Sequence, residues 1–129
     1  MRYLRALKIF RSIVEDDTAQ YRQHPEEADV LARNALDRAQ KHKHPLRRVW
    51  DDLTTFLRLL RSWATGKYRL LPWKSLSLII GAVLYFMSPI DAIPDLIPGL
   101  GFVDDAFIIG WVMRRIRSDV EDFREWERV

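Results

Sequence analysis

Leu76-Ser77-Leu78-Ile79-Ile80-Gly81-Ala82-Val83-Leu84-Tyr85-Phe86-Met87 is followed directly by Ser88-Pro89-Ile90-Asp91-Ala92-Ile93-Pro94-Asp95-Leu96-Ile97-Pro98, and a second apolar segment then ends at Met113. Prolines and carboxylates therefore separate two of the most apolar segments of the chain. Because proline interrupts a helix interior, this pattern predicts two helices joined by an elbow rich in proline and aspartate. We expect this helical hairpin to organise the fold.

The segments outside the hairpin also have the spacing of helices. Apolar residues recur every three or four positions in residues 1–14, 28–39 and 46–63, and a last helix is predicted from about Asp104 to the C-terminus. Proline is favoured at the first helical position, so we expect Pro25, Pro45 and Pro72 to start helices. No segment alternates with period two, and the sequence therefore predicts an all-α protein.

Composition and charge divide the chain into a basic amphipathic region, residues 1–66, and a hairpin region with a charged C-terminal helix, residues 67–129. The net charge is +7 through Lys74 and −4 from Ser75 onward, within a total of +3 for 129 residues. Such a split suits a basic face that meets a polyanion, either anionic lipid or nucleic acid. The absence of cysteine excludes a disulfide framework and a thiolate metal site.

Two interpretations of the apolar hairpin remain open. The uncharged stretch Ser75–Ile90 would form a helix of about 24 Å, shorter than the ~30 Å hydrocarbon core of a bilayer, so the arms can be core helices of a soluble bundle. The alternative, which we favour, is a hairpin with a transmembrane helix that enters the cytoplasmic membrane. Basic residues flank its open end, which predicts that both termini are cytoplasmic, and Trp73 and Trp111 lie near that end. These basic residues are Lys67, Arg69, Lys74, Arg114, Arg115 and Arg117.

Small residues predict where the two arms of the hairpin touch. Ser77 and Gly81 form one small-xxx-small pair, and Ala106 and Gly110 form another at a similar distance from the elbow. Such residues allow helix backbones to approach closely, in lipid or in water. Because neither arm spans a bilayer comfortably, self-association and contacts with membrane lipid are also expected.

The elbow carries four carboxylates, which must bind a cation, share protons or accept hydrogen bonds from backbone amides. Asp91 and Asp104 fit helix caps, whereas Asp95 and Asp105 have no such explanation and are the better candidates for a functional group. Oxygen ligands suit Mg²⁺ or Ca²⁺, so a divalent cation at Asp95 and Asp105 is a hypothesis, although the spacing does not match an EF-hand.

A catalytic site is not indicated. All three histidines precede residue 45, Ser88 has no base beside it in sequence, and no glycine-rich phosphate loop is present. His42 and His44 are better explained by a solvated turn than by a metal site. We therefore expect a non-catalytic interaction or assembly module whose acidic elbow binds a cation or an unknown protein partner. The alternatives are a soluble bundle that binds nucleic acid through its basic face and a metal-dependent hydrolase at the aspartates.

The elbow motif resembles the signature of the YkvA-like family, a domain of unknown function. The resemblance covers about residues 73–116, where the Ser-Pro-Ile-Asp, Ile-Pro-Asp and Asp-Asp elements occur in order. It implies an apolar helical hairpin that is commonly regarded as membrane-associated, and it brings no activity or catalytic residue. The motif positions are Ser88, Pro89, Asp91, Pro94, Asp95, Pro98, Gly101, Asp104 and Asp105.

Overall fold

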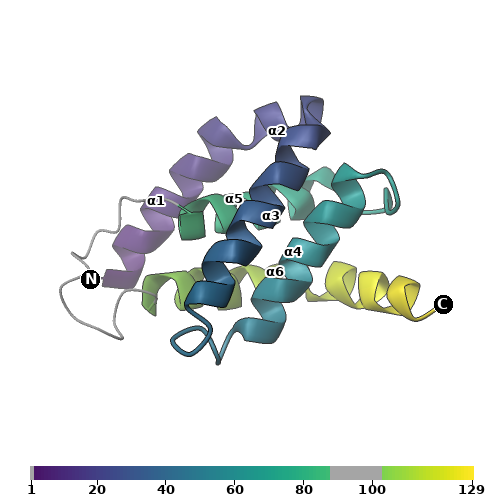
Figure 1. The fold of residues 1–129 in the computed structure, drawn as a ribbon. Helices are drawn as coiled ribbons and strands as arrows, with labels where there is room; N and C mark the ends of the chain where they lie inside the picture. Colours follow the sequence, from purple (N-terminus) through teal and green to yellow (C-terminus); the bar gives the residue numbers. More distant parts are fainter. Residues whose placement is uncertain (1, 88–102) are drawn as a thin grey trace.

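The computed structural model describes residues 2–87 and 103–129, and within this part every regular element is a helix (Figure 1). The prediction of an all-α protein is confirmed. The helices are α1 (Arg2–Asp17), α2 (Ala19–Gln23), α3 (Pro25–Lys41), α4 (Trp50–Ala64), α5 (Trp73–Met87) and α6 (Val103–Arg128).

Helix α5, which holds the first apolar arm of the hairpin, is the central helix of the bundle. It packs against α1, α3, α4 and α6. Its side chains are buried on several sides, and Ile79, Ile80 and Val83 are fully inaccessible to solvent. A helix enclosed by its neighbours has no polar face, which explains why this segment is apolar almost all round. Helices from both regions distinguished in the sequence thus share one hydrophobic core.

No helix in the described part of the chain is both long enough and apolar enough to cross a bilayer. Helix α5 has 15 residues, which corresponds to a length of about 22 Å. A membrane-spanning helix needs about 20 predominantly apolar residues. The prediction of a transmembrane helix in the hairpin is therefore not supported.

The predicted glycine contact between the two arms of the hairpin is wrong. A Cβ atom added to Gly81 would lie 2.5 Å from Cγ2 of Val14 and 3.1 Å from Cε1 of Phe10, so this glycine accommodates α1. A Cβ added to Gly110 would meet no atom of the described residues within 4 Å. The close approach predicted at Gly81 exists, but its partner is α1 and not the second arm.

Alanines let α3 pack closely on its neighbours. Ala28, Ala32, Ala35 and Ala39 are completely buried, and the most extensive interface of α3 is with α4. Pro25 occupies the start of α3, as predicted, and Glu26 and Glu27 in the first turn complement the positive end of the helix dipole. The small alanine side chains on this face of α3 thus suit a short distance between helices.

The other two prolines do not occupy a first helical position. Residues 42–49 form turns in which the Val49 amide donates to the Leu46 carbonyl, and α4 begins only at Trp50, so the prediction for Pro45 is wrong. Pro72 directly precedes α5, and its carbonyl accepts a 3.0 Å hydrogen bond from the Leu76 amide.

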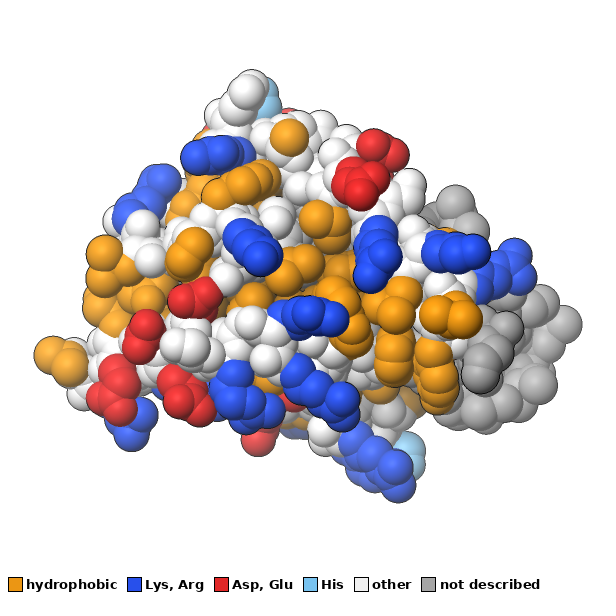
Figure 2. Space-filling view, turned by 180° about the vertical axis from the view of Figure 1, so that it is seen from behind, with side chains coloured by type: hydrophobic (Ala, Val, Ile, Leu, Met, Phe, Trp, Pro, Cys, Tyr) orange, Lys and Arg blue, Asp and Glu red, His pale blue; other side chains and the backbone are white. Residues whose placement is uncertain are grey.

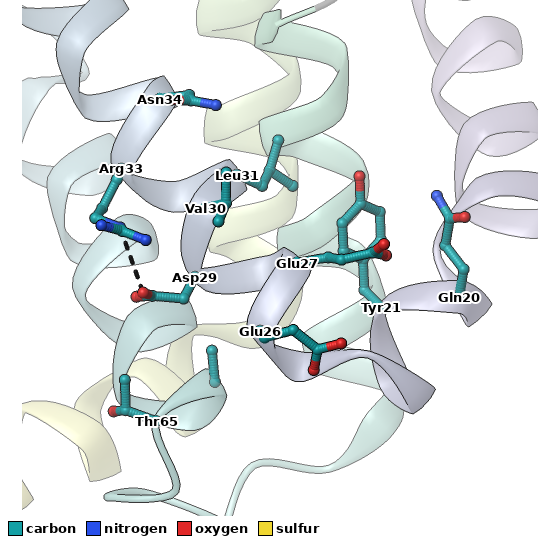
Figure 3. Close-up of a pocket in the computed structure, with 11 residues that line it drawn as sticks. Gln20, Tyr21, Glu26, Glu27, Asp29, Val30, Leu31, Arg33, Asn34 and Thr65 are labelled. Atoms are coloured by element: carbon teal, nitrogen blue, oxygen red, sulfur yellow. Dashed lines mark ion pairs between the residues drawn. The ribbon is translucent and has the colours of Figure 1, made fainter.

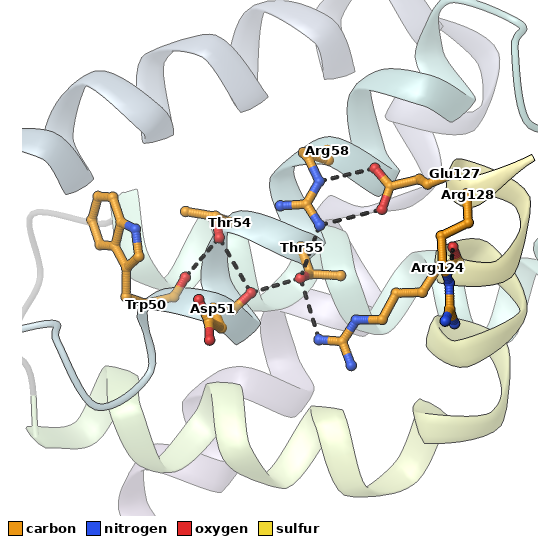
Figure 4. A network of polar contacts seen from close by, with 8 residues as sticks. All are labelled: Trp50, Asp51, Thr54, Thr55, Arg58, Arg124, Glu127 and Arg128. Carbon is orange, nitrogen blue, oxygen red and sulfur yellow. Dashed lines mark hydrogen bonds and ion pairs between the residues drawn. The ribbon is translucent and has the colours of Figure 1, made fainter.

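Helix α6 is kinked at Ile116, where the backbone leaves helical geometry (Figure 1). Before the kink, Phe107 stacks on Tyr3 and Trp111 meets Phe10 edge to face, so this half packs on α1. Beyond the kink, α6 reaches α4. Figure 4 shows two hydrogen bonds from the Arg58 guanidinium of α4 to the Glu127 carboxylate, with lengths of 2.9 and 3.3 Å.

Candidate functional site

Most of the predicted elbow site lies outside the described residues. These positions are Ser88, Pro89, Asp91, Pro94, Asp95, Pro98 and Gly101. The described members are Asp104 and Asp105, which lie in the first turn of α6, where carboxylates complement the helix dipole. Because α6 begins at Val103, the prediction that Asp104 caps the helix is wrong. Asp105 is only 3% exposed.

Within residues 2–87 and 103–129, no cluster of three or more histidine or acidic side chains is arranged to hold a metal ion. The cation hypothesis for Asp95 and Asp105 remains a prediction, because Asp95 lies outside the described residues. His42 and His44 both lie in the turn between α3 and α4, and Nε2 of His44 is 3.2 Å from the Arg47 guanidinium.

A hollow of about 720 Å³ lies beside α2 and α3 (Figure 3). Asp29 on its wall is bound to Arg33 at 3.3 Å and to Arg61 at 3.0 Å. Burial raises the pKa of the Tyr21 hydroxyl above its usual value, and the Glu27 carboxylate raises it further. Tyr21 therefore stays protonated at neutral pH and is no candidate for a base.

The first hollow is acidic, because Glu26, Glu27 and Asp29 outnumber Arg33 among its described lining residues, whereas a second hollow is basic. This basic groove, of about 560 Å³, lies where α1, α5 and α6 meet. Arg11 of α1, Lys74 of α5 and Arg115 of α6 line it, and among the residues that the structure describes Asp119 is the single acidic one on its wall. The rest of its lining is Pro72, Ser75, Leu78, Trp111 and Ile116.

Neighbouring side chains hold two of the groove's charged groups, Arg115 and Asp119. The Arg115 guanidinium lies over the Trp111 ring, 4.3 Å from its centre, and Trp111 in turn packs edge to face on Phe10 at 5.8 Å. The Ser75 hydroxyl donates a short hydrogen bond to the Asp119 carboxylate. The groove therefore combines cations from three helices with apolar surface, and one of these cations, Arg115, is held against an aromatic ring.

The loop that leads into α5 holds one apolar side chain out in solvent. Leu70 is 81% exposed, although residues on either side of it are anchored. Tyr68 is 4% exposed and packs edge to face on Phe123, and Leu71 is 7% exposed. The φ of +81° at Gly66 supplies the left-handed residue at the start of this loop. The exposure of Leu70 is thus built into a fixed loop.

Figure 2 shows the face opposite to the view of Figure 1, and there Lys and Arg side chains are spread over an apolar surface. Most acidic side chains on this face lie in the lower left of the view, and one group lies in the upper right. Apolar surface interleaved with cations is the composition expected of a surface that meets anionic lipid.

Comparison with known proteins places the chain in a family. The model described as "Protein of unknown function (DUF1232)" matches residues 75–111. The chain is also 40% identical, over 74 residues, to the "Uncharacterized membrane protein YkvA" of Bacillus subtilis (strain 168), covering 57% of this chain and 70% of that relative. The chain belongs to the DUF1232 family. No solved structure matches it significantly.

The DUF1232 match begins at Ser75 and ends at Trp111, and both residues line the basic groove. Two of the groove's cations, Lys74 and Arg115, were among the basic flanks predicted from the sequence. Arg11 was covered only by the prediction of a basic amphipathic region, residues 1–66. Its convergence with the other two depends on the packing of α1 at Gly81, which no sequence spacing specifies.

Proposed function

We propose that this protein is a non-catalytic helical module that associates with the surface of an anionic membrane through its basic groove and the loop at Leu70. The observation that carries this proposal is the convergence of Arg11, Lys74 and Arg115 from three helices beside Trp111. The name of the Bacillus subtilis relative, an uncharacterized membrane protein, agrees with this proposal.

The groove and the loop supply the two forces that hold proteins at a bilayer surface. A lysine or arginine near an anionic leaflet contributes about 1 kcal/mol, and three converging cations therefore contribute on the order of 3 kcal/mol. Transfer of an exposed leucine side chain from water adds roughly 1.5–3 kcal/mol if it is fully buried. Leu70 and the cations together are enough for reversible attachment.

Attachment at the surface agrees better with the packing than insertion of the hairpin does. Insertion of α5 would separate it from α1, α3, α4 and α6, and Phe86 and its neighbours would exchange protein contacts for lipid contacts with no gain in hydrophobic burial. Surface binding leaves this core intact.

The acidic elbow stays a prediction as a site for a cation or a protein partner. The cytoplasmic placement of both termini and self-association also stay predictions. They are compatible with surface attachment, since the elbow joins the ends of α5 and α6 that lie away from the basic groove.

Vesicle co-sedimentation tests the proposed function. The protein should pellet with vesicles of phosphatidylcholine and phosphatidylglycerol and stay in solution with vesicles of phosphatidylcholine alone. Binding should weaken as salt is raised, because screening shortens the range of the attraction to about 3 Å at 1 M. Equal recovery with both vesicle types would contradict the proposal. Tighter, steeply salt-dependent binding to DNA or RNA would favour the nucleic-acid alternative.

A further inference from the structure

We infer that the basic groove is a binding site for the phosphate of a single anionic lipid headgroup, with Arg115 as its principal ligand. This inference rests on the proposed membrane function and adds a defined site to it. A diffuse basic surface would need only net charge, whereas a site needs cations that converge and are held in place.

The cations of the groove converge on a common space. Arg11, Lys74 and Arg115 come from three different helices, and each side chain is exposed and able to reach into the groove. Asp119 is the one acidic residue among the lining residues, so the wall carries a net positive charge. A phosphate monoanion or a phosphodiester matches this charge.

Arg115 is the cation best prepared to bind a phosphate. Its guanidinium stacks 4.3 Å from the centre of the Trp111 ring, and Trp111 is itself held by Phe10. A stacked guanidinium loses less rotational freedom on binding and can still direct two N–H groups at two phosphate oxygens. Lysine at this position would keep the charge but lose this geometry.

The apolar part of the groove favours a lipid over a free phosphate. Leu78, Trp111 and Ile116 line the same hollow as the cations. An indole side chain suits the boundary between headgroups and acyl chains. A glycerophospholipid offers both a phosphate for the cations and apolar carbon for this wall.

Asp119 opposes the binding of an anion and thereby provides a specific test. Its carboxylate accepts the hydrogen bond of Ser75, an interaction that an asparagine oxygen can also accept. Asp119→Asn removes a negative charge from the groove wall while keeping this acceptor. Affinity for anionic vesicles should therefore rise about fivefold, the factor expected for one charge at an anionic surface.

The decisive experiment compares two variants that lose the same number of charges. R11Q/K74Q/R115Q empties the groove of cations, and K41Q/K43Q/R48Q removes three exposed cations around the turn between α3 and α4. Binding to phosphatidylglycerol vesicles should fall about a hundredfold in the first variant and less than threefold in the second. R115K, which conserves charge, should weaken binding at least threefold. Circular dichroism melting checks that all variants fold.

Each outcome of this experiment decides something specific. Equal losses in the two triple variants, or an unchanged R115K, would show diffuse attraction and overturn the headgroup site while leaving surface association intact. Absence of binding by the unmodified protein would overturn both proposals. Displacement from vesicles by micromolar glycerol phosphate would make the groove a site for a free phosphate compound and overturn the lipid assignment.

Discussion

At the scale of single residues, Gly81 decides how closely α1 approaches the central helix. A Cβ atom there would lie 2.5 Å from a methyl group of Val14, a β-branched residue with little rotamer freedom in a helix. Gly110 sits in an equally helical position, but space is open where its Cβ would be. The two glycines therefore form a matched pair in which only packing differs.

Gly81→Ala should lower the free energy of unfolding by about 1–2 kcal/mol, because overpacking outweighs the gain in helix propensity. Gly110→Ala should raise it by roughly 0.5–1 kcal/mol, since only the propensity gain remains. Urea unfolding followed by circular dichroism measures both. A stabilised Gly81→Ala protein would show that α1 does not pack at this point.

A substitution at Leu70 should affect membrane attachment without affecting the stability of the fold. It is 81% exposed, so Leu70→Gln should leave the melting temperature unchanged. Loss of its apolar contact with lipid should weaken vesicle binding about tenfold, which corresponds to roughly 1.4 kcal/mol. Val30→Gln is the control, because Val30 is also exposed, at 46%, but lines the acidic hollow. Equal effects of the two substitutions on vesicle binding would show that Leu70 does not contact the membrane.

At the scale of elements, the loop before α5 is anchored by Tyr68, and this anchor is sensitive to alkaline pH. Burial raises the pKa of the Tyr68 hydroxyl above its usual value of 10.0, and the carboxylates of Asp122 and Asp119 raise it further. The folded protein keeps this proton at a pH where the unfolded chain has lost it. Stability that is complete below pH 10 must therefore fall as the pH rises through and beyond that value.

Tyr68→Phe should flatten this alkaline loss, because phenylalanine has no proton to release. Melting temperatures measured between pH 8 and pH 11 should fall less steeply in the variant than in the unmodified protein. Tyr21→Phe should remove a second, separate part of the stability loss at alkaline pH, since the pKa of Tyr21 is also raised. An identical slope in the Tyr68 variant would contradict this explanation, because it would mean that folding does not raise the pKa of the Tyr68 hydroxyl.

The elements also show how far the sequence could predict the structure. Residues 50–64 form an amphipathic helix because Leu53, Phe56 and Leu60 repeat at helical spacing. The sequence predicted this helix but placed its start too early, at Pro45. Helix α5 has neighbours on many sides, so its periodicity cannot say which helix meets Gly81. An apolar run of this length also has the same composition in a protein core as in a membrane, and only the packing distinguishes the two.

The candidate site was predictable only in part, because it also depends on which helices pack together. The basic flanks Lys74 and Arg115 are visible in the sequence because they border the apolar arms. Arg11 is 63 positions before Lys74, and its place in the groove follows from the packing of α1 on α5. The elbow motif gave the family correctly, and the DUF1232 match confirms it.

At the scale of the whole molecule, the protein is a bundle that keeps its most apolar helix, α5, inside. It presents the cations of the basic groove at its surface. The central claim is that such a molecule attaches to a membrane surface without inserting its hairpin. Membrane fractions washed at neutral pH with about 1 M salt, and then with alkaline carbonate, test this claim most directly. The protein should sediment with membranes and be released by the salt wash. Retention in the pellet after both washes would contradict it by showing an inserted hairpin, and recovery outside the membrane fraction before any wash would contradict association itself.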